Sequence, residues 1–136
     1  MNQLLIDTNV VLRLFVDTDS KLHQRAERIL FPVFYGQQQA VISILAISEI
    51  IWILDSYYQI KKKEYVPMVI GLLSCKNIRV YELDRSEAVS LLQAHKITAL
   101  SWVDLYLYLL SRKNGFELAS FDKKLVRRMA QPNDII

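Results

Sequence analysis

The sequence contains only one cysteine, Cys75, so a disulfide within the chain is excluded and a reducing compartment is favoured. Glycine and proline are also scarce, with three of each, which favours long helices joined by compact connections. No apolar run approaches the roughly 20 residues that a membrane-spanning helix needs. The first residues lack a basic segment, and Asp7 interrupts their apolar run, so we expect no signal peptide. These absences predict a soluble protein of the cytoplasm.

Charge of one sign is not in large excess either. Seventeen basic and fourteen acidic residues leave a net charge of +3, too weak for a protein that coats nucleic acid non-specifically. Apolar residues make up 52% of the chain, which is enough for a continuous core and excludes disorder. Because 136 residues is a usual domain size, we expect a single domain over residues 1–136.

Short apolar runs alternate with longer helical patterns along the chain. Strands are expected at residues 3–6, 40–42, 78–83 and 117–120. Helices are expected near residues 10–15, 21–30, 44–58, 61–74, 86–95, 101–115 and 123–129. Pro67 either delays the start of its helix or kinks it. The alternation predicts an α/β fold with a central, mostly parallel sheet of about four to five short strands flanked by helices.

Four of the acidic residues differ from the others because each interrupts or adjoins an apolar segment. They are Asp7, Glu49, Asp104 and Asp122. Ligands of parallel sheets bind outside the carboxyl ends of the strands, and Asp7 and Asp122 each follow an expected strand. If the four carboxylates converge, they repel one another unless a cation neutralises them. Mg²⁺ or Mn²⁺ fits such a set of oxygen ligands. For each acid alone, the alternative is a partnered or half-exposed side chain.

A metal held by these acids could activate a water and orient a phosphate, so no serine, cysteine or histidine nucleophile is required. Thr8, Asn9 and Ser120 could form a second shell around the ligands, or could simply make turn and cap hydrogen bonds. Spacing typical of a zinc site is absent. His23 and His95 lie far apart in the sequence, and we expect both to be solvated.

With these acids located, three stretches resemble the motifs of PIN-domain ribonucleases. The family's opening strand, with its aspartate, hydroxyl residue and asparagine, is similar to LLIDTNVVLRLF. The segment that carries the family's glutamate is matched by ISILAISEIIWIL. The last pair of motifs resembles SWVDLYLYLLSRKNGFELASFDKKL. The motifs occur in the right order over essentially the whole chain, and the chain looks most like the toxin subunits of VapBC-type toxin–antitoxin pairs.

This resemblance implies a Mg²⁺- or Mn²⁺-dependent endoribonuclease that hydrolyses RNA phosphodiester bonds. The implied acidic quartet, which binds the metal, is Asp7, Glu49, Asp104 and Asp122. It also implies a homodimer and a cognate antitoxin, whose peptide occupies a groove near the active site. The sequence departs from the family pattern beside the third acid, where bulky residues replace small ones. These residues, which could narrow the pocket, are Trp102, Val103, Leu105, Tyr106 and Tyr108.

Basic and aromatic residues supply candidate contacts for partners. RNA phosphates could be guided by Arg13, Arg112 and Lys123, although a solvated basic face explains any one of them. Further basic residues late in the chain are Lys113, Lys124, Arg127 and Arg128. Aromatic residues could line a dimer or antitoxin surface, or pack in the core; these are Phe31, Phe34, Tyr35, Trp52, Tyr57 and Tyr58.

Two other classes of function compete with the nuclease. A catalytically silent PIN-like module would recruit RNA or protein without chemistry, which the intact quartet disfavours. A phosphotransfer receiver also places acids at strand ends, but it expects paired acids after its first strand. Asp7 stands alone there, so the receiver is the weaker alternative.

Overall fold

The computed structural model describes residues 3–130 of the chain. The chain divides into two compact units, Met1–Arg85 and Ser86–Ile136, called here the amino-terminal and carboxy-terminal units. Each unit is described by itself. No helix within residues 3–130 is both long enough and apolar enough to cross a membrane.

The amino-terminal unit contains a parallel sheet of three strands, β1 (Leu4–Leu5), β2 (Ala40–Ile42) and β3 (Ile78–Val80), in that order across the sheet. Ala40 lies opposite Leu4 on one side and Ile78 on the other. All of β2 is buried, which explains why its sequence is a continuous apolar run. The prediction of these strands is confirmed. Because they run parallel, their carboxyl ends lie at one edge of the sheet.

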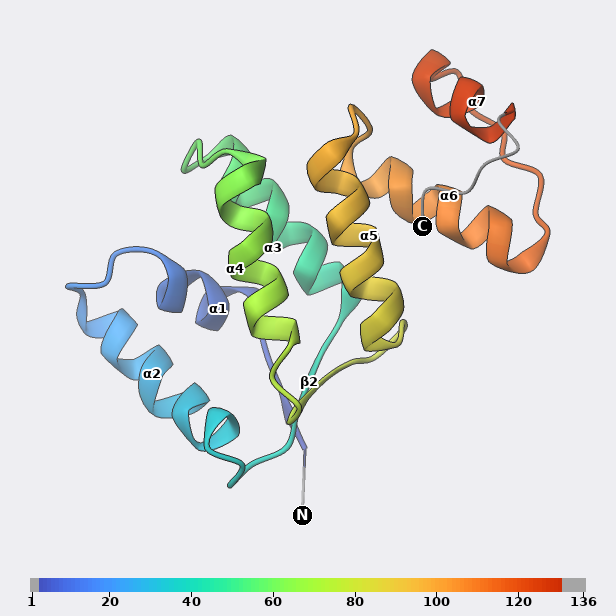
Figure 1. The fold of residues 1–136 in the computed structure, drawn as a ribbon. Helices are drawn as coiled ribbons and strands as arrows, with labels where there is room; N and C mark the ends of the chain where they lie inside the picture. The colour runs from blue at the N-terminus through green and yellow to red at the C-terminus, as the bar shows by residue number, and fades with distance from the viewer. Residues whose placement is uncertain (1–2, 131–136) are drawn as a thin grey trace. The chain divides into compact units, whose positions relative to one another are not determined.

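Helices follow the first two strands and precede the third. Within the described part of this unit they are α1 (Thr8–Phe15), α2 (Lys21–Phe34), α3 (Ile44–Ser56) and α4 (Lys62–Leu73). Helix α1 packs against α2 and α3, and α3 packs against α4, as Figure 1 shows. The buried apolar residues of α3 include Ile47, Ile50 and Leu54, none of which is exposed. The helices therefore build the core that holds the sheet.

Two prolines lie inside these helices without ending them. Helix α4 begins at Lys62, ahead of Pro67, so the predicted delay of its start is wrong. Helix α2 continues past Pro32 to Phe34, beyond the predicted end at residue 30. A proline removes one helical hydrogen bond, but the fully buried Val33 keeps the last turn of α2 packed. Tertiary packing offsets the local cost here.

The carboxy-terminal unit is helical in its described part. It contains α5 (Arg85–Ile97), α6 (Trp102–Asn114) and α7 (Lys123–Ala130), with α6 and α7 in contact. The Ser101 side chain accepts a 3.1 Å hydrogen bond from the backbone of Asp104 and caps α6. Gly115 ends the helix with φ of 67°, a left-handed conformation that glycine adopts without strain. Both predicted boundaries of α6 are confirmed.

Residues 117–120, expected as a fourth strand, have no strand pairing within the described residues and connect α6 to α7. The described part of the carboxy-terminal unit contains no strand. A strand needs a neighbour that completes its backbone hydrogen bonds, and an extended pattern in the sequence cannot supply one. Asp122 thus follows a loop. The fold class remains α/β, with a parallel sheet and a predominance of helix.

Candidate active site

Asp7 occupies the turn between β1 and α1, at the carboxyl edge of the sheet. Its backbone is extended, and its Oδ1 accepts a 2.8 Å hydrogen bond from the backbone of Thr8, so it is the N-cap of α1. The Asp7 side chain is exposed, whereas Thr8 is buried. No described residue donates a hydrogen bond to Asp7 Oδ2. The cap therefore holds the carboxylate in place and leaves one oxygen for a ligand.

Glu49 lies on the exposed side of α3, the helix that follows β2. It forms no hydrogen bond or ion pair with any residue in the described range. Leu45 and Trp52, four residues before it and three after, share its face and are 75% and 65% exposed. Because α1 packs on α3, both acids of this unit are carried by helices that touch.

A third acid, which the sequence prediction overlooked, lies at the same edge of the sheet. Glu82 follows β3, and its two oxygens accept 2.8 Å hydrogen bonds from the Ser43 hydroxyl and the Ile44 backbone. Both bonds join the end of β3 to the first turn of α3. The available signal was an acid two residues after a strand. Because both of its oxygens bind the helix start, Glu82 is a positioning residue for the helix that carries Glu49.

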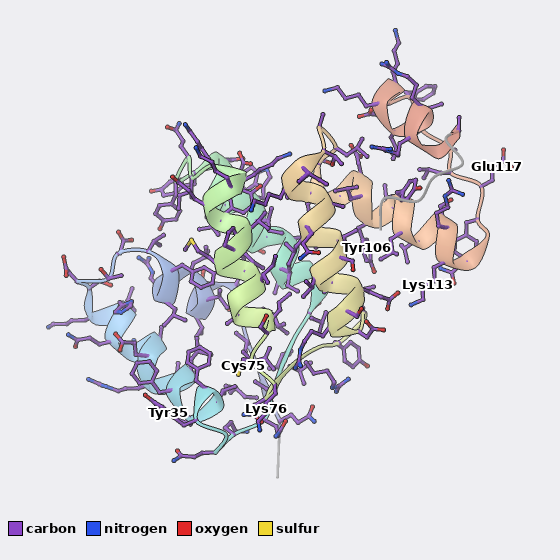
Figure 2. The ribbon with its side chains drawn as sticks, viewed as in Figure 1. Tyr35, Cys75, Lys76, Tyr106, Lys113 and Glu117 are labelled. Atoms are coloured by element: carbon purple, nitrogen blue, oxygen red, sulfur yellow. The ribbon has the colours of Figure 1, made fainter. Side chains whose placement is uncertain are left out.

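Asp104 lies in the first turn of α6 and is half-buried. Of the bulky residues around it, Trp102 and Leu105 are buried, and Tyr108 is fully buried. Val103 is 55% exposed. Figure 2 shows Tyr106 on the same helix. Most of the bulk that departs from the family pattern therefore packs in the protein interior.

Asp122 caps the last described helix. Its Oδ1 accepts hydrogen bonds of 2.9 and 3.1 Å from the backbones of Lys124 and Leu125. Its own backbone donates to the Ser120 hydroxyl at 3.0 Å, so Ser120 makes the turn hydrogen bond that was its alternative role. Asp122 is exposed, and like Asp7 it uses one carboxylate oxygen for the cap.

The four predicted acids are divided evenly between the two units. Asp7 and Glu49 belong to the amino-terminal unit, and Asp104 and Asp122 belong to the other. Within either unit alone, the described residues bring together no group of three or more histidine, cysteine, aspartate or glutamate side chains that could hold a metal. None of the four pairs with a cation in the described range. Ion pairs in that range include those of Asp17, Glu27 and Glu87.

The expectation that both histidines are solvated is wrong. His95 is buried, its Nδ1 lies 3.3 Å from the Leu100 carbonyl oxygen, and its ring packs edge-on against Trp102. The Nδ1 of His23 lies 2.8 Å from the Arg13 carbonyl oxygen, and its Nε2 contacts Glu27. Each histidine is held by a partner in the fold, which leaves carboxylates as the candidate metal ligands.

The three predicted phosphate contacts differ in their surroundings. Arg13 pairs with Asp17 at 3.2 Å and lines an open cleft of about 290 Å³ between α1 and α2 together with Asn9. The Arg112 guanidinium lies 5.3 Å from the centre of the Tyr108 ring. Lys123, in the first turn of α7, is exposed. Only Lys123 adjoins a predicted acid in the sequence.

Parallel strands, flanking helices and acids at strand and helix ends characterise an α/β domain. The model of one family, described as PIN domain, matches residues 4–131. The chain therefore belongs to the PIN-domain family. PIN domains are generally nucleases that bind RNA and use divalent metal ions, which makes this chain a nuclease of the hydrolase class. Neither a curated protein nor a solved structure matches the chain.

Proposed function

We propose that the protein is a Mg²⁺- or Mn²⁺-dependent endoribonuclease that hydrolyses RNA phosphodiester bonds. Its catalytic acids and metal ligands are Asp7, Glu49, Asp104 and Asp122, in a single PIN domain over residues 1–136. One observation carries the proposal: the family match spans both units, and the four acids that fit the family's motifs lack any cationic partner among residues 3–130.

Electrostatics supports a divalent cation as the missing partner. Two carboxylates about 4 Å apart repel by roughly 4 kcal/mol at an effective dielectric constant of 20. Four such groups in one site therefore require neutralisation. The donor set consists of hard oxygen ligands, which suit Mg²⁺ and Mn²⁺ better than the nitrogen and sulfur ligands that zinc prefers. When bound, such an ion supplies Lewis-acid stabilisation of the charge that develops on the phosphate.

The residues of the chain itself orient these ligands. The caps formed by Asp7 and Asp122 each fix a carboxylate through one oxygen, so the other oxygen is presented without free rotation of the side chain. Thr8 supplies the N–H that holds Asp7, and Ser120 holds the backbone of Asp122. Glu82 fixes the start of the helix that carries Glu49. These contacts favour a preorganised set of ligands.

We also infer that the enzyme is the toxin of a type II toxin–antitoxin pair in the cytoplasm, and that it forms a homodimer. The cleft between α1 and α2 suits an antitoxin peptide with acidic and apolar side chains, since Arg13 and Arg25 line it beside the half-exposed Leu22 and Ile29. At the carboxyl end of α2, Tyr35 (Figure 2) and the two phenylalanines before it form an exposed aromatic group. The exposed Leu45 and Trp52 of α3 are candidates for the dimer surface.

The replacements Asp7→Asn and Asp104→Asn test the nuclease. Asparagine caps a helix about as well as aspartate, so Asp7→Asn keeps α1 but removes a negative ligand. We expect cleavage of single-stranded RNA in Mn²⁺ to fall about 100-fold or more, because a neutral amide ligates the ion more weakly. Growth arrest on expression should be lost as well.

A matched control is Asp19→Asn, which neutralises an exposed acid outside the quartet. It should cleave as the wild type does, and circular dichroism should show the same helical content in all variants. Cleavage at the wild-type rate by both quartet variants would refute the proposed site. A calorimetric titration without Mn²⁺ binding, together with retained RNA binding, would instead establish the catalytically silent module.

A further inference from the structure

Helix α7 carries a basic strip that faces a cleft within the carboxy-terminal unit. The cleft has a volume of about 380 Å³. Its lining consists of Lys124, Arg127 and Arg128 from the helix and residues 97–100 from the end of α5 and the turn before α6. The three cations stand at positions i, i+3 and i+4, so they lie along one side of the helix, while Leu125 is buried. A concave, cationic surface of this kind suits an anion.

Lys124 and Arg127 are like charges three residues apart on α7. Like charges three or four residues apart destabilise a helix by about 0.2–0.5 kcal/mol per pair. Helix α7 contains no acidic residue to offset them. Lys124 also stands in the first turn, where the helix dipole disfavours a cation, although Asp122 caps that turn. Helix α7 forms despite this repulsion between like charges, which favours a functional role for Lys124 and Arg127.

One of the proposed metal ligands, Asp122, caps the helix that lines the cleft. Lys124 and Arg127 follow Asp122 by two and five residues, about 3 to 8 Å along the helix axis at 1.5 Å per residue. Neighbouring phosphates of one strand are held at a short covalent spacing, so a strand bound at Asp122 can place a flanking phosphate at the cleft. The guanidinium group of Arg127 matches the geometry of two phosphate oxygens.

We propose that the cleft between α7 and residues 97–100 binds a backbone phosphate of single-stranded RNA, one that flanks the scissile phosphate. The proposal rests on the proposed nuclease function for the identity of the ligand. Lys124 and Arg127 supply the charge, and the walls of the cleft limit how far the strand can move. The contact is independent of base identity, because it involves only the phosphate.

Binding of a fluorescent single-stranded RNA by full-length protein in EDTA tests the proposal without cleavage. The variant is Lys124→Gln/Arg127→Gln. Each phosphate contact on a single strand contributes a slope of about −0.7 to the dependence of log K on log salt, so the slope should become shallower by about 1.4. Between 50 and 200 mM salt, the wild type should then lose about sevenfold more affinity than the variant loses.

The matched control, Lys21→Gln/Arg28→Gln, removes one lysine and one arginine from the exposed side of α2. It changes the net charge equally and should keep the wild-type slope. Arg127→Lys keeps the charge and should keep the slope as well, which separates loss of the contact from loss of the fold. In Mn²⁺, the double variant of α7 should raise KM for RNA cleavage and leave kcat close to the wild-type value.

An unchanged salt slope in the folded double variant of α7, or an equal change in the α2 control, would overturn the proposal. Failure of the nuclease function gives a different result. In that case the quartet variants cleave RNA as the wild type does, or the wild type itself does not cleave RNA. The salt slope in EDTA still reports whether the cleft binds phosphate. The two proposals are thus decided by separate measurements.

Discussion

Replacing Glu82 with alanine tests the connection between the end of β3 and the start of α3. The replacement removes both hydrogen bonds of the carboxylate, one from the Ser43 hydroxyl and one from the Ile44 backbone, each 2.8 Å long. It also removes a negative charge from the amino-terminal end of a helix. The Ser43 hydroxyl still accepts a hydrogen bond from the backbone of Leu45, so one N–H group in the first turn of α3 keeps its partner.

The expected loss of stability follows from these contacts. A hydrogen bond to a charged group contributes about 1.5–3 kcal/mol when it is shielded, and a charge at a helix terminus contributes about 0.3–1 kcal/mol. Glu82 is exposed, so water replaces much of what is lost. We therefore expect about 1–2 kcal/mol of destabilisation for Glu82→Ala. In Glu82→Gln, the amide group cannot accept a bond at both positions, so its effect should lie between wild type and alanine.

Urea unfolding with circular dichroism measures this free energy. The control is Glu117→Ala, the same change at an exposed glutamate in the loop after α6 (Figure 2), where no described residue binds the side chain. A calorimetric Mn²⁺ titration of the folded variant gives a second measurement, since displacement of α3 should weaken the contribution of Glu49. The positioning role would be refuted if Glu82→Ala and Glu117→Ala had equal stability and equal Mn²⁺ affinity.

Two further changes test features of the fold. Burial and the nearby Asp55 carboxylate raise the pKa of Tyr65, whose hydroxyl donates a 3.1 Å hydrogen bond to Asp55. The folded protein therefore favours the protonated phenol, so stability should be constant below about pH 10 and fall above it, where the unfolded chain ionises first. Tyr65→Phe should lower the free energy of unfolding by about 1 kcal/mol at pH 8 and should reduce its further decrease at high pH. Urea unfolding at pH 8 and 10.5 measures both effects. An equal decrease between these two pH values in the variant and the wild type would contradict the prediction. Gly115→Ala places a side chain at φ of 67° and should cost about 1 kcal/mol, measured as a lower thermal midpoint; an unchanged midpoint would exclude strain there.

Local interactions explain which parts of the structure were predictable. Ser20 and Ser101 each accept a hydrogen bond from a backbone three residues ahead, and Gly115 ends its helix within the same turn. Such signals are complete within a few neighbouring residues. The first three strands were equally apparent, because a buried parallel strand is a short run of apolar residues.

Contacts that form only in the folded chain explain the errors. The carboxylate of Glu82 binds residues 38 and 39 positions earlier, so no local pattern reveals its role. His95 is buried against the ring of Trp102 and the carbonyl of Leu100, although its own neighbours include the exposed Lys96. Residues 117–120 have an extended pattern, but a strand forms only where another strand accepts its hydrogen bonds.

The order of the acidic residues and the helical settings of Glu49 and Asp104 were determined by the sequence alone, because caps and hydrophobic periodicity act over a few residues. The tertiary structure decided which carboxylate oxygens already accept hydrogen bonds. Asp7 and Asp122 each use one oxygen in a helix cap, and Glu82 uses both oxygens to bind the start of α3. The physical reason is that a carboxylate's remaining capacity for a ligand depends on which donors the folded chain brings to it.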